Sequence, residues 1–123
     1  MIVCFDQLKQ LFQYLPSQLE NLALEIETND PTCLDGQMWE DYFRDTFPQL
    51  NHFEFLIIFR SIDSNSSQSL RIRDVLKTFQ GDYWSSITPQ QTTGYYNRFW
   101  YDQSMCIHTN PIPIVQRRRF FLY

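Results

Sequence analysis

Residues 52–60, with the sequence His-Phe-Glu-Phe-Leu-Ile-Ile-Phe-Arg, decide the architecture that we expect for this chain. Side chains alternate between the two faces of a β-strand, so every second residue shares a face. One face carries Phe53, Phe55, Ile57 and Phe59. The other face begins with His52 and Glu54 and then becomes apolar. Strands that are apolar on both faces usually lie inside a sheet that is covered on both sides, so an inner strand is predicted here.

A helix and a proline precede this strand, and the same order of elements occurs earlier in the chain. Apolar side chains three and four positions apart predict one helix over residues 5–15 and another over residues 38–47. Pro16 and Pro48 end these helices, because proline donates no backbone hydrogen bond and restricts the residue before it. After the first proline, apolar residues alternate with small or acidic ones over 22–26, which predicts a half-buried strand.

The two helix–proline–strand units share a leucine-rich frame. The frame L-x-x-L-x-L starts at Leu19, and its counterpart starts at Leu50, an offset of 50 − 19 = 31 residues. A period near 30 with this frame is typical of leucine-rich repeats. One unit cannot bury its apolar face alone, so repeated units stack and share a core. We therefore expect residues 22–26 and 53–57 to be adjacent parallel strands, whereas an antiparallel meander would indicate a different α+β domain.

Capping residues mark further helix boundaries. Asp35 is suited to cap the helix over 38–47, because its side-chain oxygen accepts from the free amides of a first turn. A polar loop over 61–69 leads to Ser69, a second capping residue, and to a third set of apolar side chains at helical spacing. Gly81 is placed as the C-terminal glycine of that third helix.

The last part of the chain has an aromatic, strand-like pattern. Residues 95–101 alternate, and two polar residues separate them from the short run 104–109, which predicts a β-hairpin. We therefore expect a single α/β domain over residues 1–123. Leucine-rich-repeat-like units with parallel strands occupy residues 5–60, and a helix and an aromatic β-hairpin cap occupy residues 61–123.

The composition excludes several classes of function. The chain has 123 residues and a net charge of −4, which argues against nucleic acid and anionic membranes as partners. Its longest apolar run, residues 55–59, is too short to span a bilayer. The N-terminus has no basic region and no long apolar region, so we expect an intracellular protein with free cysteines. The basic run Arg117–Arg119 is interpreted as a solvated strand edge.

The sequence contains no catalytic, metal-binding or cofactor-binding motif that we can identify. His52 and Glu54 would share a strand face, as in a base–carboxylate pair, but a surface pair is the simpler interpretation. Cys106 and His108 would also share a face, as in a nucleophile–base pair, although no orienting carboxylate is nearby in the sequence. With three glycines, the chain has no glycine-rich phosphate loop. We expect neither an enzyme nor a metal or cofactor.

Three stretches of the first sixty residues carry a resemblance to a known family. These stretches are residues 15–26, with Leu15-Pro16 at their start, residues 34–40 (Leu-Asp-Gly-Gln-Met-Trp-Glu) and residues 47–55, which begin Phe-Pro-Gln-Leu. Over residues 10–60, the chain resembles the leucine-rich-repeat-like C-terminal region of F-box proteins. In such proteins, an F-box helix bundle docks on the adaptor of a cullin-type ubiquitin ligase, and the repeats capture a substrate protein. The resemblance therefore implies a substrate-capturing role for the repeat-like units of this chain.

The chain departs from this family in three respects. No F-box is visible before the first unit, and two units are fewer than the three that a repeat array usually needs. Either the C-terminal strands act as a cap, or the chain is the C-terminal part of a longer protein, which is the alternative that we favour. The Asn/Cys position of the repeat holds Glu27 in one unit and Ile58 in the other, so the usual asparagine ladder is missing.

Two hypotheses for function follow from these patterns. In the first, the chain is a protein–protein interaction module, and its contact surface consists of Ala23, Glu25, His52, Glu54 and Leu56. In the second, it is a small ligand-binding or enzyme domain, and its pocket is lined by Tyr95, Phe99, Trp100 and His108. Parallel pairing of residues 22–26 with residues 53–57 would support the first hypothesis, and an antiparallel meander would support the second.

Overall fold

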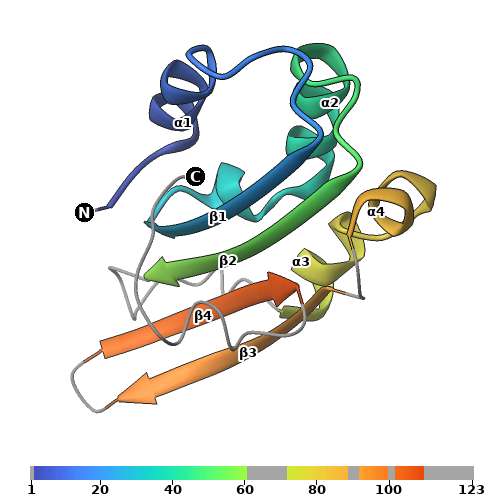
Figure 1. Ribbon diagram of the computed structural model, residues 1–123. Coiled ribbons are helices and arrows are strands. Elements are labelled where there is room, and N and C mark those ends of the chain that lie inside the picture. Colours follow the sequence, from blue (N-terminus) through green and yellow to red (C-terminus); the bar gives the residue numbers. More distant parts are fainter. Residues whose placement is uncertain (1, 61–71, 89–91, 100–101, 110–123) are drawn as a thin grey trace.

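A computed structural model describes residues 2–60, 72–88, 92–99 and 102–109, with the backbone alone for residues 95–99 and 102–104 (Figure 1). The described elements are α1 (Phe5–Phe12), β1 (Asn21–Thr28), the 3-10 helix η1 (Pro31–Leu34), α2 (Gly36–Thr46), β2 (His52–Arg60), α3 (Ile72–Thr78), α4 (Asp82–Ile87), β3 (Thr92–Phe99) and β4 (Asp102–Thr109). The chain is therefore a mixed α/β protein. None of the described helices is long and apolar enough to cross a membrane.

The strands form one mixed sheet in the order β1-β2-β4-β3. β1 and β2 are parallel and in register, with Leu22 beside Phe53 and Leu24 beside Phe55. β4 pairs antiparallel with both β2 and β3. The expected parallel neighbours are thus present, and β2 is an inner strand as predicted. β3 and β4 extend the same sheet on the side of β2 that is away from β1.

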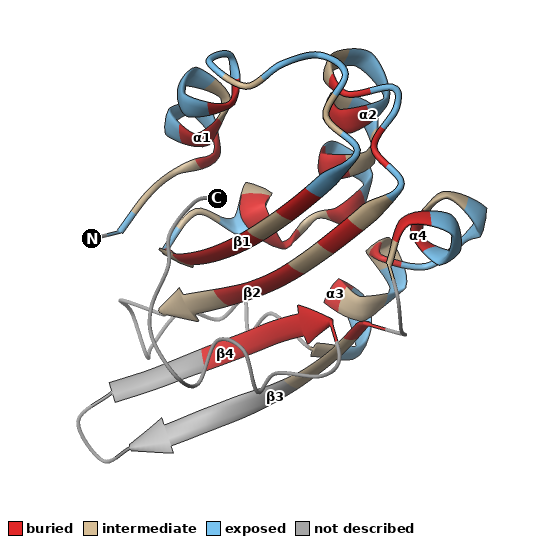
Figure 2. Cartoon of the chain, in the orientation of Figure 1, coloured by how far each residue is buried: buried red, intermediate tan, exposed pale blue. Residues whose placement is uncertain are grey.

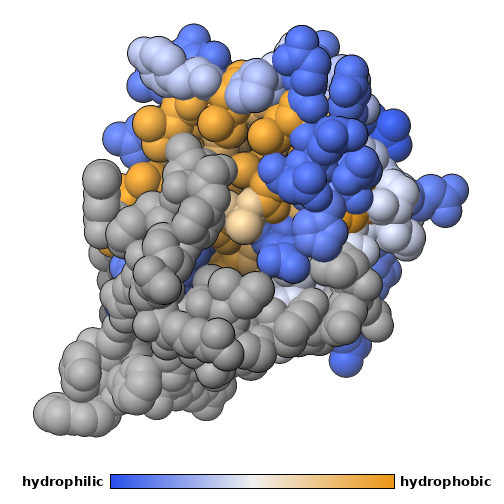
Figure 3. Space-filling view, viewed as in Figure 1, coloured by the Kyte–Doolittle hydropathy of each residue, from blue (hydrophilic) through white to orange (hydrophobic). Residues whose placement is uncertain are grey.

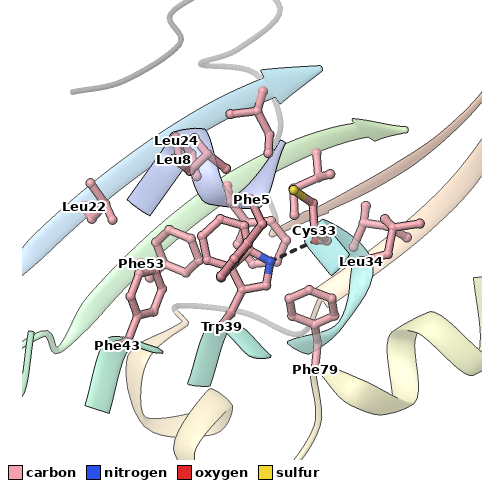
Figure 4. Packing of buried hydrophobic residues seen from close by; sticks show 14 of the residues in the cluster. Phe5, Leu8, Leu22, Leu24, Cys33, Leu34, Trp39, Phe43, Phe53 and Phe79 are labelled. Atoms are coloured by element: carbon pink, nitrogen blue, oxygen red, sulfur yellow. Dashed lines mark hydrogen bonds between the residues drawn. The ribbon is translucent and has the colours of Figure 1, made fainter. Parts of the chain in front are cut away.

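The helices lie on one face of the sheet and bury an aromatic core (Figures 2 and 4). Trp39 and Phe43 of α2 are fully buried, and the ring of Phe43 meets that of Phe53 edge to face, with the centroids 5.0 Å apart. The indole nitrogen of Trp39 donates a hydrogen bond of 2.9 Å to the carbonyl of Cys33. The hydrophobic side chains of one sheet face and the apolar faces of the helices therefore share one core.

α1 ends at Phe12, three residues before the end that the apolar spacing predicts. The amides of Tyr14 and Leu15 bond to the carbonyls of Leu11 and Phe12, three positions back, so the chain tightens into a turn. Pro16 explains this turn, because it disfavours the helical conformation at Leu15.

Both longer helices have their N-termini held by side chains. Asp35 caps α2, as predicted, by accepting a 3.0 Å hydrogen bond from the amide of Gln37. At the start of α1, the carboxylate of Asp30 accepts a 2.9 Å hydrogen bond from the amide of Phe5, 25 residues away. The same carboxylate accepts a 3.0 Å bond from the amide of Thr32 in η1. Asp30 thereby joins the end of β1 to the start of α1.

The first residue of α2 also packs closely against the end of α3. The amide of Gly36 donates a 2.7 Å hydrogen bond to the hydroxyl of Thr78. A Cβ atom at position 36 would collide with the carbonyl oxygen of Thr78. The close approach of the two backbones therefore requires glycine at position 36.

The connection between α3 and β3 differs from the sequence-based expectation. α3 ends at Thr78, and Gly81 lies three residues later with a φ of 116°, as the residue that precedes α4. α4 was not predicted, because only six residues form it and just Trp84 and Ile87 of these are buried. Trp84 packs against Phe79, with ring centroids 4.9 Å apart, and thereby attaches α4 to the core.

Candidate functional site

The candidate site is the sheet face opposite the helices. In the β1–β2 ladder, Ala23 lies beside Glu54 and Glu25 lies beside Leu56, while His52 lies beside Asn21. Alternation of side chains places all six residues on this face. The structure thus brings together the five residues of the predicted contact surface and adds Asn21 to them. Asn21 was missed because the apolar alternation starts one residue later.

Burial divides this face into an accessible half and a covered half. Ala23, His52 and Glu54 are half-buried, and Asn21 is exposed. Glu25 and Leu56, in contrast, are only 4% and 7% exposed. The accessible part of the predicted contact surface is therefore at the N-terminal ends of β1 and β2, and we name Asn21, Ala23, His52 and Glu54 the sheet-face patch.

His52 and Glu54 form a side-chain pair within the sheet-face patch. Their Nε2 and Oε1 atoms are 3.2 Å apart, and the side chains are 42% and 35% exposed. An exposed pair of this kind contributes about 0–1 kcal/mol to stability, because water screens it. Among the described residues, no group of three or more histidine, cysteine, aspartate or glutamate side chains is arranged to hold a metal ion. The pair is therefore a water-accessible feature of the sheet-face patch.

The covered half of the face is organised around His108. This residue lies beside Leu56 on one side and beside Thr93 on the other. The Nε2 atom of His108 is 3.1 Å from the hydroxyl of Thr93, and its Nδ1 atom is 3.1 Å from the carbonyl of Thr109. Cys106, the predicted nucleophile of the Cys–His pair, is buried, as is His108. A nucleophile must reach its substrate, so both side chains are poorly placed for that chemistry.

The predicted aromatic pocket falls mainly outside the described residues. His108 is described, and its imidazole contacts Thr93 and Thr109 as given above. Tyr95 and Phe99 lie on β3, but the description of these residues covers the backbone alone, and Trp100 lies outside it. The pocket therefore stays a prediction.

An ion pair joins β1 to β2 at the other end of the face. The Nε atom of Arg60 is 3.0 Å from a carboxylate oxygen of Glu27. The two side chains are 32% and 13% exposed, so the pair is partly shielded from water. This ion pair holds the C-terminal ends of the two parallel strands together.

Two side chains away from the sheet face, the buried Cys33 and the half-buried Tyr83, have strongly raised pKa values. Burial raises the pKa of the Cys33 thiol to about 12, although Thr28 donates it a hydrogen bond of 3.6 Å. Thiolates, not thiols, are nucleophilic, and burial disfavours the thiolate form of Cys33. Burial also raises the pKa of Tyr83 to about 12, against the opposing effect of the Arg44 guanidinium, which lies 4.6 Å from the ring centroid. No protein-family model, curated protein or solved structure matches this chain.

Proposed function

We propose that this chain is a protein-binding module built from leucine-rich-repeat-like helix–strand units, and that it is the substrate-binding part of an F-box-type ubiquitin-ligase receptor. The observation that carries the proposal is the register of β1 and β2. All pairs of this ladder, from Asn21 beside His52 to Thr28 beside Phe59, join residues 31 positions apart. The leucine-rich frame has the same offset of 31 residues. Equivalent residues of the two units are therefore neighbours, as stacked repeats require.

The sheet-face patch is the surface at which we expect the partner to bind. Helices fill the other face of β1 and β2, and none of the described helices covers the sheet-face patch. The patch combines an acidic side chain (Glu54), an imidazole (His52) and a small apolar side chain (Ala23). Residues 1–60 contain 10 acidic and 3 basic side chains, a net charge of −7. Complementary charge increases the rate and specificity of association, so the proposed partner is a basic, partly apolar protein.

The variant Glu54→Lys tests this surface. Glu54 is half-exposed, so lysine at this position should leave the fold intact while reversing a charge within the patch. Asp45→Lys is the matched control, because Asp45 is an exposed acid on α2, away from the sheet face. Melting temperatures of both variants within a few degrees of the wild type would show that they fold.

The measurement is affinity purification of the tagged chain from its native cells, followed by mass spectrometry. We expect the wild type and Asp45→Lys to recover the same partner together with ubiquitin-ligase subunits, and Glu54→Lys to lose the partner. If Glu54→Lys kept the partner at the same level, the surface assignment would be wrong. If the wild type recovered no partner, the interaction proposal would fail and the pocket hypothesis would gain support.

A further inference from the structure

The outer edge of β1 is a second surface that is available for recognition. β1 is the terminal strand of the described sheet, with β2 on one side alone (Figure 1). Edge strands present unpaired backbone groups, and an extended chain can add to them as a further strand. The availability of this edge depends on which residues direct their backbone groups outward.

Two sets of hydrogen bonds fix the direction of the backbone groups along β1. The carbonyl of Glu20 accepts from the amides of Asn51 and His52, at 2.9 and 3.1 Å, so it points toward β2. The carbonyl of Glu27 accepts a 2.9 Å bond from the amide of Val3, so it points toward the outer edge. In a parallel ladder, the backbone groups of successive residues point to opposite sides. Asn21 and Ala23 therefore direct their amides and carbonyls outward.

The chain itself shows the geometry that an added strand would adopt at this edge. Ile2 forms a parallel bridge with Glu27, at the C-terminal end of β1. The described residues place no strand beside Asn21 and Ala23, which are exposed and half-buried, respectively. The edge at residues 21–24 is thus the part of β1 that remains accessible.

Apolar surface lies next to this edge. In Figure 3, hydrophobic side chains gather over the region of α1 and β1 and are bordered by hydrophilic ones. Ile2 and Leu11 are exposed, and Val3, Leu15 and Leu19 are partly buried against the core. On the helix-covered face, Leu22 and Leu24 continue the same apolar layer up to the edge. An added strand would therefore gain by placing apolar side chains at alternate positions, on the side of the helices.

We propose that the edge of β1 at residues 21–24 binds an extended segment of a partner protein, which runs parallel to β1 and carries apolar side chains at alternate positions. The parallel direction is the one in which Ile2 already pairs with Glu27 at this edge. The alternation follows from the apolar layer beside Leu22 and Leu24. This site uses the backbone groups of Asn21 and Ala23, whose side chains belong to the sheet-face patch, and it does not use His52 or Glu54 on β2, so a variant at Glu54 distinguishes the two sites.

The probe for this site is a synthetic peptide with the sequence of residues 19–28, Leu-Glu-Asn-Leu-Ala-Leu-Glu-Ile-Glu-Thr, blocked at both ends. The peptide has the required alternation, and in the chain this segment already pairs in parallel with β2. A second peptide has lysine in place of the last two glutamates, so that it cannot be repelled by the acidic chain. A third has proline in place of the leucine that corresponds to residue 24, whose amide would point toward β1 in the parallel arrangement, and serves as the negative control.

Hydrogen exchange of the full chain detects the added strand directly. Without peptide, we expect the amides of Leu22 and Leu24 to be protected and that of Ala23 to exchange at least tenfold faster. With either of the first two peptides, the amide of Ala23 should become protected, whereas the proline peptide should have no effect. If neither peptide protected Ala23, the proposal would be overturned.

Matched variants of the chain give an independent test of the edge. Ala23→Pro removes an amide that points away from β2, so the β1–β2 ladder should survive, and peptide affinity should fall at least tenfold. Ala23→Val keeps the amide and should keep the affinity. Glu54→Lys should not change peptide binding, which separates failure of this proposal from failure of the sheet-face patch. Concentration-dependent protection of Ala23 without peptide, together with a dimer in sedimentation, would assign the edge to a second copy and overturn the partner assignment.

Discussion

The two helix–proline–strand units have the same frame but different surroundings. In the second unit, α2 has 11 residues, and its Trp39 and Phe43 are fully buried, while β2 is bonded to a neighbour on each side. In the first unit, α1 has 8 residues and buries Phe5, Leu8 and Phe12, whereas Leu11 is 45% exposed and Tyr14, just beyond the helix, is 84% exposed. β1 has a neighbouring sheet strand on one side. Both units therefore contribute buried side chains to one core, and the position of a unit in the sheet decides whether its strand has a neighbour on each side.

Truncation of a buried side chain in the second unit and of an exposed side chain in the first should give the largest contrast. Phe43→Ala deletes a fully buried ring that contacts Trp39, Phe47 and Phe53. It should lower the free energy of unfolding by about 3–5 kcal/mol, because the cavity cannot collapse completely. Leu11→Ala removes an exposed side chain and should cost less than about 0.5 kcal/mol. Urea denaturation followed by circular dichroism measures both, and equal losses would contradict the contrast between the units.

The start of α2 provides a contrast of intermediate size. Gly36→Ala places a methyl group against the carbonyl of Thr78, so α2 and α3 must move apart. Overpacking of this kind costs about 1–3 kcal/mol. Ser17→Ala, at an exposed position between α1 and β1, is a suitable control from the first unit and should change stability by less than about 0.5 kcal/mol. A fully stable Gly36→Ala variant in thermal melts would show that the two backbones are not tightly packed.

The start of α1 should give the smallest effect, and the effect should depend on pH. Burial alone would raise the pKa of Asp30, but hydrogen bonds from the amides of Phe5 and Thr32 outweigh it and lower the pKa below its ordinary value. The ionised Asp30 carboxylate therefore adds to the free energy of unfolding. Its contribution is fully present above the unfolded-state pKa, about 3.9, and is lost as the pH falls through the folded-state pKa. Asp30→Asn should cost about 1 kcal/mol at pH 7.

Denaturation curves at pH 7 and in steps below pH 4 test this expectation. The wild type should lose stability over the acidic range, and Asp30→Asn should show a smaller loss there, because it lacks one of the titrating groups. Glu20→Gln, at an exposed position before β1, is the matched control and should follow the wild type. Parallel curves for Asp30→Asn and the wild type would show that Asp30 does not hold the start of α1.

The fold of the first sixty residues could be predicted because its signals are local. Phenylalanines at alternate positions predict β2, and the offset of the leucine-rich frame predicts the register in which Leu22 lies beside Phe53. The burial of Leu56 could not be predicted in this way. It depends on β4, which places His108 beside Leu56 from 52 positions later in the chain. The close approach of Gly36 and Thr78 likewise joins elements that carry no sequence signal for each other.

The central position of β2 has a consequence for how the chain folds. Seven of its residues, 53–59, contain one charge and neither proline nor glycine, which is the composition of segments that form cross-β aggregates. Its parallel partner is 31 residues away, and its antiparallel partner β4 pairs at separations such as 108 − 56 = 52 residues. Contacts at such separations form slowly, because long loops must close first. β2 therefore lacks its second neighbour until β4 has been made, and Glu54 and the flanking His52 and Arg60 are the polar residues that oppose its self-association in that interval.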